Sequence, residues 1–263
     1  MYPELLRIGC VSIHSYGVAL ALACLLAIGL ARHATRRSLH GVVPMDETAL
    51  VDWGMWTMLG GILGGRALYV LLNWDVYAAR PQEIVALWHG GLVWYGGFAG
   101  GCLASGLYLK RHRYSLWRGL DQIIPFVALG HAIGRIGCFA NGCCYGTPTS
   151  AWYGVQFPGV PSPVVPTQLI ESASLVVLYV ILRSFQTPAV LRRPGALFGL
   201  YLVGYGLIRW TVEYWRANQP IVWAGLTLSQ VISFALVVAG ISLLAATQRH
   251  LSEASSASHG SSA

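Results

Sequence analysis

The amino-acid sequence predicts an all-α integral membrane protein that crosses the bilayer with seven helices, its N-terminus outside and its C-terminus in the cytoplasm. Three observations predict this fold class. Charged residues are too few for a water-exposed surface, seven apolar stretches are long enough to span a bilayer, and the basic residues cluster after alternate stretches. We expect residues 1–248 to form the seven-helix domain and residues 249–263, rich in Ser and Ala, to form a disordered cytoplasmic tail.

The composition excludes an ordinary soluble protein. Hydrophobic residues make up 55% of the chain and charged residues only 10%, whereas about a quarter of the residues of a soluble domain are charged. Lipid must therefore cover much of the surface. The net charge of +7 does not indicate nucleic acid as a partner, because the basic residues lie in short clusters between apolar stretches, the arrangement that orients a protein in a membrane.

The apolar stretches set the number of spans. A spanning helix needs about 20 mostly apolar residues, and seven stretches fulfil this condition. They are 13–31, 49–72, 90–109, 120–139, 166–184, 195–214 and 224–246. Paired glycines at 60–61, 64–65, 96–97 and 100–101 lie within them. These pairs favour close helix packing over the alternative, backbone amides exposed to a ligand.

The basic residues assign the sidedness. Most of the 17 Lys and Arg residues follow the first, third, fifth and seventh stretches. They are Arg32, Arg36, Arg37, Lys110, Arg111, Arg113, Arg118, Arg183, Arg192, Arg193 and Arg249. The opposite connections hold only Arg7, Arg80 and Arg216. Because the basic side of a membrane protein faces the cytoplasm, the N-terminus is predicted outside and the number of spans is odd.

Three further arginines, Arg66, Arg135 and Arg209, fall inside the predicted spans. A charge in hydrocarbon is expensive, so it faces a partner or a wet cavity. One interpretation is structural pairing, such as Arg209 with Glu213 one helical turn away. The other is a shared site, because the helix directions place all three arginines toward the outer side. A guanidinium group suits a phosphate, which predicts an anionic phospholipid head group as the ligand.

One motif and its companions resemble a known family. GRIGCFANG at 134–142, followed by Gly146, resembles the signature of bacterial prolipoprotein diacylglyceryl transferases. Further segments match this family in order and spacing, and the resemblance covers about residues 12–246. They are LGGRALYV at 63–70, HGGLVWYGG at 89–97, PTQLIE at 166–171, GYGLIRWTVEYWR at 204–216 and GLTLSQ at 225–230.

The resemblance implies a multi-pass enzyme of the bacterial plasma (inner) membrane whose active site faces the outer leaflet. Such an enzyme transfers the diacylglyceryl group of phosphatidylglycerol to the lipobox cysteine thiol of a preprolipoprotein signal peptide and releases glycerol phosphate, the first step of lipoprotein maturation. No cofactor is expected. By motif, Arg135 and Arg209 are the essential arginines. The residues expected to bind substrate are Tyr16, Arg66, Asn141, Gly146, Glu171, Glu213 and Arg216.

The proton acceptor departs from the family pattern. Well-known members carry histidine at the position of Tyr95, and a phenol with an ordinary pKa near 10 is a poorer base at neutral pH than an imidazole. Tyr95 is a predicted catalytic residue that orients or hydrogen-bonds the phosphate. His131 is the alternative base, because it lies four residues before Arg135 and therefore on the same helix face.

The cysteines are a second departure. Cys138 and Cys143 stand where the family usually has Asn and Glu, and Cys144 follows directly. Their spacing lacks the two pairs typical of zinc sites, so no metal is expected. Two interpretations stay open: small residues packed in a loop, or a disulfide on the oxidising outer side of the membrane.

Other classes of function stay open as well. Charges within a membrane also mark the substrate path of a transporter, although the sequence has no internal repeat of the kind many transporters show. The departures at Tyr95, Cys138 and Cys143 keep a third reading open, a non-catalytic or divergent relative that binds anionic phospholipid and uses a different acceptor.

Overall fold

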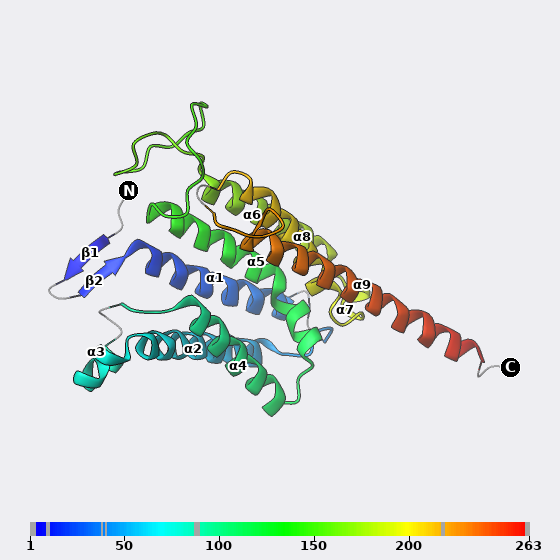
Figure 1. Cartoon of the computed structure of the whole chain (residues 1–263). Helices are drawn as coiled ribbons and strands as arrows, with labels where there is room; N and C mark the ends of the chain where they lie inside the picture. The colour runs from blue at the N-terminus through cyan, green and yellow to red at the C-terminus, as the bar shows by residue number, and fades with distance from the viewer. Residues whose placement is uncertain are drawn as a thin grey trace. The chain divides into compact units, whose positions relative to one another are not determined.

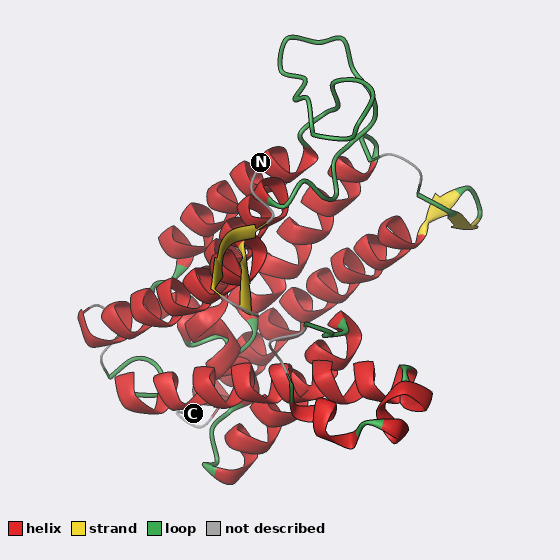
Figure 2. Ribbon diagram, turned by 90° about the vertical axis from the view of Figure 1, so that its left-hand side faces the viewer, coloured by secondary structure: helices red, strands yellow, loops and turns green. Residues whose placement is uncertain are grey.

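The computed structural model describes residues 4–8, 11–37, 39, 41–86, 90–216 and 219–260. Their backbone contacts divide the chain into two compact units. The first unit holds residues 1–5, 13–30 and 120–263, and the second holds residues 6–12 and 31–119. Helices dominate both units, and the strands form only short two-stranded sheets (Figures 1 and 2).

A long helix occupies most of each of the seven predicted stretches. These helices are α1 (Ser15–Arg37), α2 (Glu47–Leu72), α4 (Trp94–Arg111), α5 (Leu116–Ala140), α6 (Thr167–Phe185), α8 (Ala196–Glu213) and α9 (Leu228–Gly260). Among the described residues, α1, α2, α5, α6 and α9 are long and apolar enough to cross a membrane. The chain is therefore a helical membrane protein. Seven spans stay a prediction, because α4 and α8 have only 18 residues each and carry charges at or near their C-terminal ends. The orientation of the termini stays a prediction as well.

The remaining elements are short, and no pattern in the sequence predicted them. Strand β1 (Glu4–Ile8) pairs with β2 (Val11–His14), and β3 (Ile221–Trp223) pairs with β4 (Leu226–Thr227). The short helices are α3 (Trp74–Ala79), η1 (Pro81–Val85) and α7 (Pro188–Leu191). Helix α9 runs past residue 248 to Gly260, so part of the predicted tail is helical, and the disorder of 249–263 stays a prediction.

The core of the first unit lies where α5, α6 and α8 meet (Figure 1). Its fully buried members are Ile124, Ala128 and Ala132 from α5, Leu175, Leu178 and Leu182 from α6, and Leu197 from α8. Small residues let α9 approach α8, because a Cβ atom on Gly206 would lie 2.7 Å from a methyl carbon of Val237. On another side of α5, a Cβ atom on Gly130 would lie 3.4 Å from the carbonyl oxygen of Ala23 in α1.

Asp121 ties α5 to the start of α8. Its two carboxylate oxygens accept hydrogen bonds from the backbone N–H groups of Gly195 and Phe198 at 2.6 and 2.8 Å. A carboxylate at this place satisfies N–H groups that a helix start otherwise leaves unpaired. Asp121 is 1% exposed, and its contacts make it a structural residue of the bundle.

In the second unit the paired glycines bring α2 and α4 into backbone contact. A Cβ atom on Gly64 would overlap the carbonyl oxygen of Gly96 and would lie 2.8 Å from the Cα atom of Gly100. Gly60 meets Gly100 in the same way, with its Cβ position 2.7 Å from the carbonyl oxygen. The prediction of close packing by small residues is confirmed. Membrane helices associate through such close backbone packing, because in lipid the hydrophobic effect does not drive helices together.

Candidate active site

Helices α5 and α6 place a buried ion pair in the first unit. Nη2 of Arg135 lies 2.8 Å from Oε1 of Glu171, and the Glu171 side chain is 3% exposed. Nε2 of His131, one turn before Arg135, lies 4.0 Å from the same carboxylate oxygen. His131 and Arg135 therefore share a helix face, as their spacing predicts.

Helix α8 carries a second buried ion pair, one turn apart on the same helix. Nη2 of Arg209 lies 2.6 Å from Oε2 of Glu213, and it also donates a hydrogen bond to Oγ of Ser229 at 2.8 Å. The other oxygen of Glu213 accepts a hydrogen bond of 2.7 Å from Oγ1 of Thr227. The structural pairing of Arg209 with Glu213 is confirmed, and Thr227 at the end of β4 and Ser229 at the start of α9 hold the pair in place.

The two pairs belong to one site. Both guanidinium charges, of Arg135 and of Arg209, act on the imidazole of His131 and on the phenol of Tyr205. The rings of His131 and Tyr205 meet edge to face, with centroids 5.0 Å apart. The site therefore presents two arginines and two acids, with an imidazole and a phenol between the pairs.

Three guanidinium nitrogens in this unit are buried and lack a hydrogen-bond partner among the described residues. They are Nε of Arg135, Nη1 of Arg209 and Nε of Arg216. Native structures leave few buried donors unpaired, and each one calls for an explanation such as a ligand or a water. The carboxylates do not use these three donors, which leaves them for an incoming acceptor. A phosphate, with several acceptor oxygens and negative charge, matches them best.

The loop between α5 and α6 holds Arg216 next to this region. Gly146 pairs with Arg216 in an isolated β-bridge, and Thr147 donates a backbone hydrogen bond of 2.7 Å to the carbonyl oxygen of Trp215. A Cβ atom on Gly146 would overlap that oxygen and would lie 2.8 Å from a methyl carbon of Thr167. Glycine is required because the two backbones touch.

Tyr16 and Asn141 lie near the C-terminal end of α5. A Cβ atom on Gly137 would lie 3.6 Å from the ring of Tyr16, so the start of α1 packs against this end of α5, and Tyr16 is within electrostatic reach of Arg135. The backbone N–H of Asn141 bonds the carbonyl oxygen of Gly137 at 3.0 Å. Of the predicted site residues, nine lie in this unit, and the list is Tyr16, His131, Arg135, Asn141, Gly146, Glu171, Arg209, Glu213 and Arg216.

Arg66 belongs to the second unit and has a different environment. Its guanidinium donates hydrogen bonds to the carbonyl oxygens of Glu83, Ile84, Ala86, Gly90 and Gly91, and it packs over the rings of Tyr69 and Tyr77. This arginine organises the loop after α3.

Tyr95 also belongs to the second unit. It stands at the start of α4 with 68% of its surface exposed and packs edge to face on Trp94. Its catalytic role and the substrate contact of Arg66 stay predictions.

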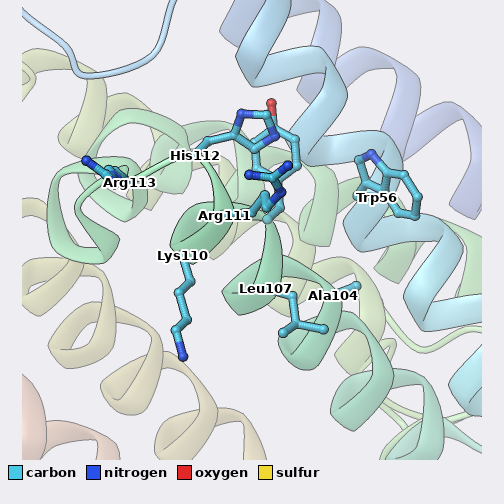
Figure 3. Close-up of a pocket in the computed structure, with 8 residues that line it drawn as sticks. Trp56, Ala104, Leu107, Lys110, Arg111, His112 and Arg113 are labelled. Carbon is cyan, nitrogen blue, oxygen red and sulfur yellow. The ribbon is translucent and has the colours of Figure 1, made fainter.

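A pocket of about 790 Å³ in the second unit lies near the C-terminal end of α4. Its lining includes Trp56, Leu107, Lys110, Arg111 and Arg113 (Figure 3). In Figure 3 the side chains of Lys110 and Arg113 extend in different directions, so these charges do not converge on one anion. The pocket contains none of the predicted site residues.

Several residues around the buried charges were not predicted from the sequence. Tyr205, Thr227 and Ser229 complete the polar surroundings, and Gln168 is 1% exposed with an amide oxygen that has no hydrogen-bond partner among the described residues. Each lies inside a segment that the motif comparison singled out. A search for hydroxyl and amide groups one or two turns from the buried charges would have found Tyr205 and Gln168.

Three cysteines, one in the last turn of α5 and two in the loop that follows it, come together. The sulfur atoms of Cys138, Cys143 and Cys144 all lie within 4.8 Å of one another. Hydrogen bonding with the Cys138 thiol and the positive charge of Arg216 lower the pKa of Cys144 to about 5. Burial raises the pKa of Cys143. The three thiols therefore differ in how readily they ionise.

Comparisons with known proteins agree on one family. A family model described as prolipoprotein diacylglyceryl transferase matches residues 3–246. Proteins named phosphatidylglycerol–prolipoprotein diacylglyceryl transferase are similar over most of the chain. That of Synechococcus elongatus is 34% identical and covers 91% of this chain and 85% of its own length. That of Rhodospirillum rubrum is 34% identical (94% and 92%), and that of Pseudomonas aeruginosa is 36% identical (92% and 92%).

Proposed function

This chain belongs to the prolipoprotein diacylglyceryl transferase family. On that premise we propose that its buried arginines bind the phosphate of phosphatidylglycerol while the diacylglyceryl group passes to a prolipoprotein. The acceptor is the lipobox cysteine of the signal peptide. Its sulfur attacks the glycerol carbon that carries the phosphate. A carbon–sulfur bond forms, the carbon–oxygen bond breaks, and glycerol phosphate leaves with the electron pair.

The charge change of this reaction explains the need for arginines. The phosphate of phosphatidylglycerol is a diester with one negative charge, and the departing glycerol phosphate is a monoester that gains a second. Fixed positive charge beside the leaving oxygen therefore stabilises the transition state more than the ground state. Arginine supplies that charge because its guanidinium does not lose its proton in a dry site.

The unpaired donors carry the proposal. Nε of Arg135, Nη1 of Arg209 and Nε of Arg216 are buried without partners, and we assign them to the phosphate oxygens. Glu171 and Glu213 each hold one arginine through another nitrogen. The carboxylates thereby fix the guanidinium groups before substrate arrives, and they neutralise two buried positive charges.

The other site residues have supporting roles in this proposal. His131 lies beside Glu171 and is the candidate to receive the thiol proton, and the phenol of Tyr95 is a candidate to orient the phosphate. Tyr16, Asn141 and Gly146, which lie in the same unit as these arginines, shape the substrate site. The work takes place in the bacterial inner membrane, with the site open to the outer leaflet.

A transfer assay tests the role of the arginines. Purified protein is incubated with labelled phosphatidylglycerol and a lipobox peptide, and the thioether-linked diacylglyceryl peptide is measured by mass spectrometry. Arg209→Lys keeps the charge but removes the forked donors, so we expect a loss of about 100-fold or more. The control is Arg192→Ala, because the Arg192 side chain is exposed. An unchanged rate for Arg209→Lys would refute the assignment.

A further inference from the structure

The C-terminal end of α5 folds back on itself in a way that pairs two cysteines. The N–H of Cys143 bonds the carbonyl oxygen of Cys138 at 3.1 Å, and the N–H of Gly142 bonds that of Phe139 at 3.0 Å. Gly142 has φ = 72°. These two bonds and the left-handed glycine make a Schellman turn, in which the side chain after the turn contacts one from the last helical turn. Here that contact joins Cys138 and Cys143.

The third cysteine is held against this pair by α6. Cys144 has φ = 65°, a left-handed conformation that a residue with a side chain adopts only when its surroundings impose it. The first turn of α6 supplies those surroundings. Oγ1 of Thr167 donates to the carbonyl oxygen of Cys144 at 2.9 Å, and Nε2 of Gln168 donates to that of Cys143 at 2.6 Å. The cluster is thus a built arrangement and not three cysteines near each other by sequence alone.

We propose that Cys138, Cys143 and Cys144 bind a thiophilic divalent cation of the Zn²⁺ class, and that its fourth position takes the thiol of the acceptor cysteine. Four sulfur ligands at 2.3 Å around a tetrahedral zinc lie about 3.8 Å apart. The three sulfur atoms already lie within 4.8 Å of one another, so rotation about the side-chain bonds closes the site. Thiolates are the ligands that Zn²⁺ and similar soft cations prefer.

The composition of the cluster leaves one coordination position open. Among the described residues, the possible ligands gathered here are the three cysteines, with no His, Asp or Glu. Three protein ligands and an open fourth position are typical of catalytic zinc, whereas structural zinc has four protein ligands. Three thiolates and one divalent cation carry one net negative charge. The guanidinium groups of Arg216 and Arg135 lie close enough to Cys144 to offset it.

The proposed role rests on the proposed function, because it concerns the acceptor thiol of the same reaction. When that thiol binds the cation, a sulfur–metal bond forms and the thiol proton passes to the base, the role that the proposed function gives to His131, since a coordinating thiol is deprotonated. The thiolate then attacks the glycerol carbon, and the carbon–oxygen bond to the phosphate breaks. The product is a thioether, a weaker ligand than a thiolate, so it leaves the cation. No electron donor or acceptor is needed.

Metal binding is tested first without reference to activity. The reduced, metal-free protein is titrated with Zn²⁺ in competition with a chromophoric chelator, and the thiols are counted. We expect one ion per chain. Cys138→Ser, Cys143→Ser and Cys144→Ser should each weaken Zn²⁺ binding by more than about 100-fold, because loss of a residue that only hydrogen-bonds a metal ligand already costs about 10- to 100-fold. Cys102→Ser is the matched control and should bind as the parent does. A protein that binds no Zn²⁺, or that holds two of the three cysteines as a disulfide resistant to mild reduction, would overturn the proposal.

The open position is tested with Co²⁺ in place of Zn²⁺. Its thiolate-to-metal absorption should change when a lipobox peptide is added and should stay the same with the peptide whose cysteine is replaced by serine. A spectrum unaffected by the cysteine peptide would overturn the role in thiol binding. The transfer assay then separates the two proposals. Loss of transfer in the metal-free protein and recovery with Zn²⁺ support the metal's role, equal transfer with and without metal refutes it, and absence of transfer in every form refutes the proposed function alone.

Discussion

Replacing Glu171 by Gln tests whether Arg135 binds the phosphate of the lipid substrate. Glu171 is the carboxylate partner of Arg135 at 2.8 Å, and both side chains are largely buried. Two unit charges at that distance attract by about 6 kcal/mol at an effective dielectric constant of about 20. Desolvation offsets part of this, and removal of one partner from a buried pair costs about 3–5 kcal/mol. At about 2–4 °C per kcal/mol, the melting temperature of Glu171→Gln should fall by about 10 °C.

The assay is thermal unfolding of the purified protein with two added lipids. Phosphatidylglycerol carries the phosphate, and diacylglycerol has the same acyl chains without it. In Glu171→Gln the guanidinium of Arg135 has lost its counter-charge, so a phosphate that reaches it replaces the missing carboxylate. Phosphatidylglycerol should therefore raise the melting temperature of Glu171→Gln more than that of the parent. Diacylglycerol should shift the two proteins equally.

A double variant serves as the control for this reasoning. Arg135→Met combined with Glu171→Leu replaces the pair by apolar side chains, a change that is often neutral for stability. The double variant should therefore melt near the parent temperature, lose the transfer activity, and gain no extra stabilisation from phosphatidylglycerol. If Glu171→Gln responds to both lipids alike, or if the double variant still transfers, Arg135 does not bind the phosphate.

Three further predictions follow from the packing and the thiols. Gly64→Ala should lower the free energy of unfolding by the roughly 1–3 kcal/mol typical of overpacking, and with it the melting temperature, because its Cβ atom would overlap a carbonyl oxygen of α4. Gly106→Ala should leave the melting temperature unchanged, since its Cβ atom would meet nothing within 4 Å. Gly146→Ala should lower the transfer rate in assays of the folded fraction, because the added methyl group pushes apart the backbones that hold the loop after α5; a rate equal to the parent's would contradict this. In the reduced, metal-free protein, the lowered pKa of Cys144 should leave it ionised and alkylated by iodoacetamide at about pH 6, whereas Cys143, with its raised pKa, should react only at higher pH; peptide mapping that finds the reverse order would refute it.

The helices were predictable because lipid leaves one strong signal in a sequence. A spanning segment must be apolar over its whole length, so a run such as 49–72 marks a helix with little ambiguity, and α2 occupies Glu47–Leu72. The ends were less predictable. Helix α4 begins at Trp94 and not at 90, because Gly90 and Gly91 have φ near 80° and cannot continue a helix. Glycine supplies that freedom wherever it occurs, and the sequence alone does not say where it is used.

The cysteine cluster was not predictable from spacing rules for metal sites. Those rules describe cysteines paired across a short loop, whereas here one cysteine lies on a helix and the next lies beyond its C-cap. Gly142, four residues after Cys138, is the one signal in the sequence, since a glycine just past a helix end favours the turn that folds the chain back. The contribution of α6, through Thr167 and Gln168, depends on a contact between helices that no local pattern encodes.

The three buried arginines show what decides between structure and function. In sequence, Arg66, Arg135 and Arg209 look alike, each an isolated charge within an apolar stretch. In the structure, backbone carbonyl oxygens accept hydrogen bonds from the Arg66 guanidinium. Such bonds lower the free-energy cost of burying its charge. Arg135 and Arg209 instead meet one carboxylate each and leave a buried nitrogen without a partner among the described residues. A buried donor without a partner carries a free-energy penalty that a bound ligand would remove. The unpaired nitrogens, more than the charges, therefore carry the proposal that the phosphate binds here.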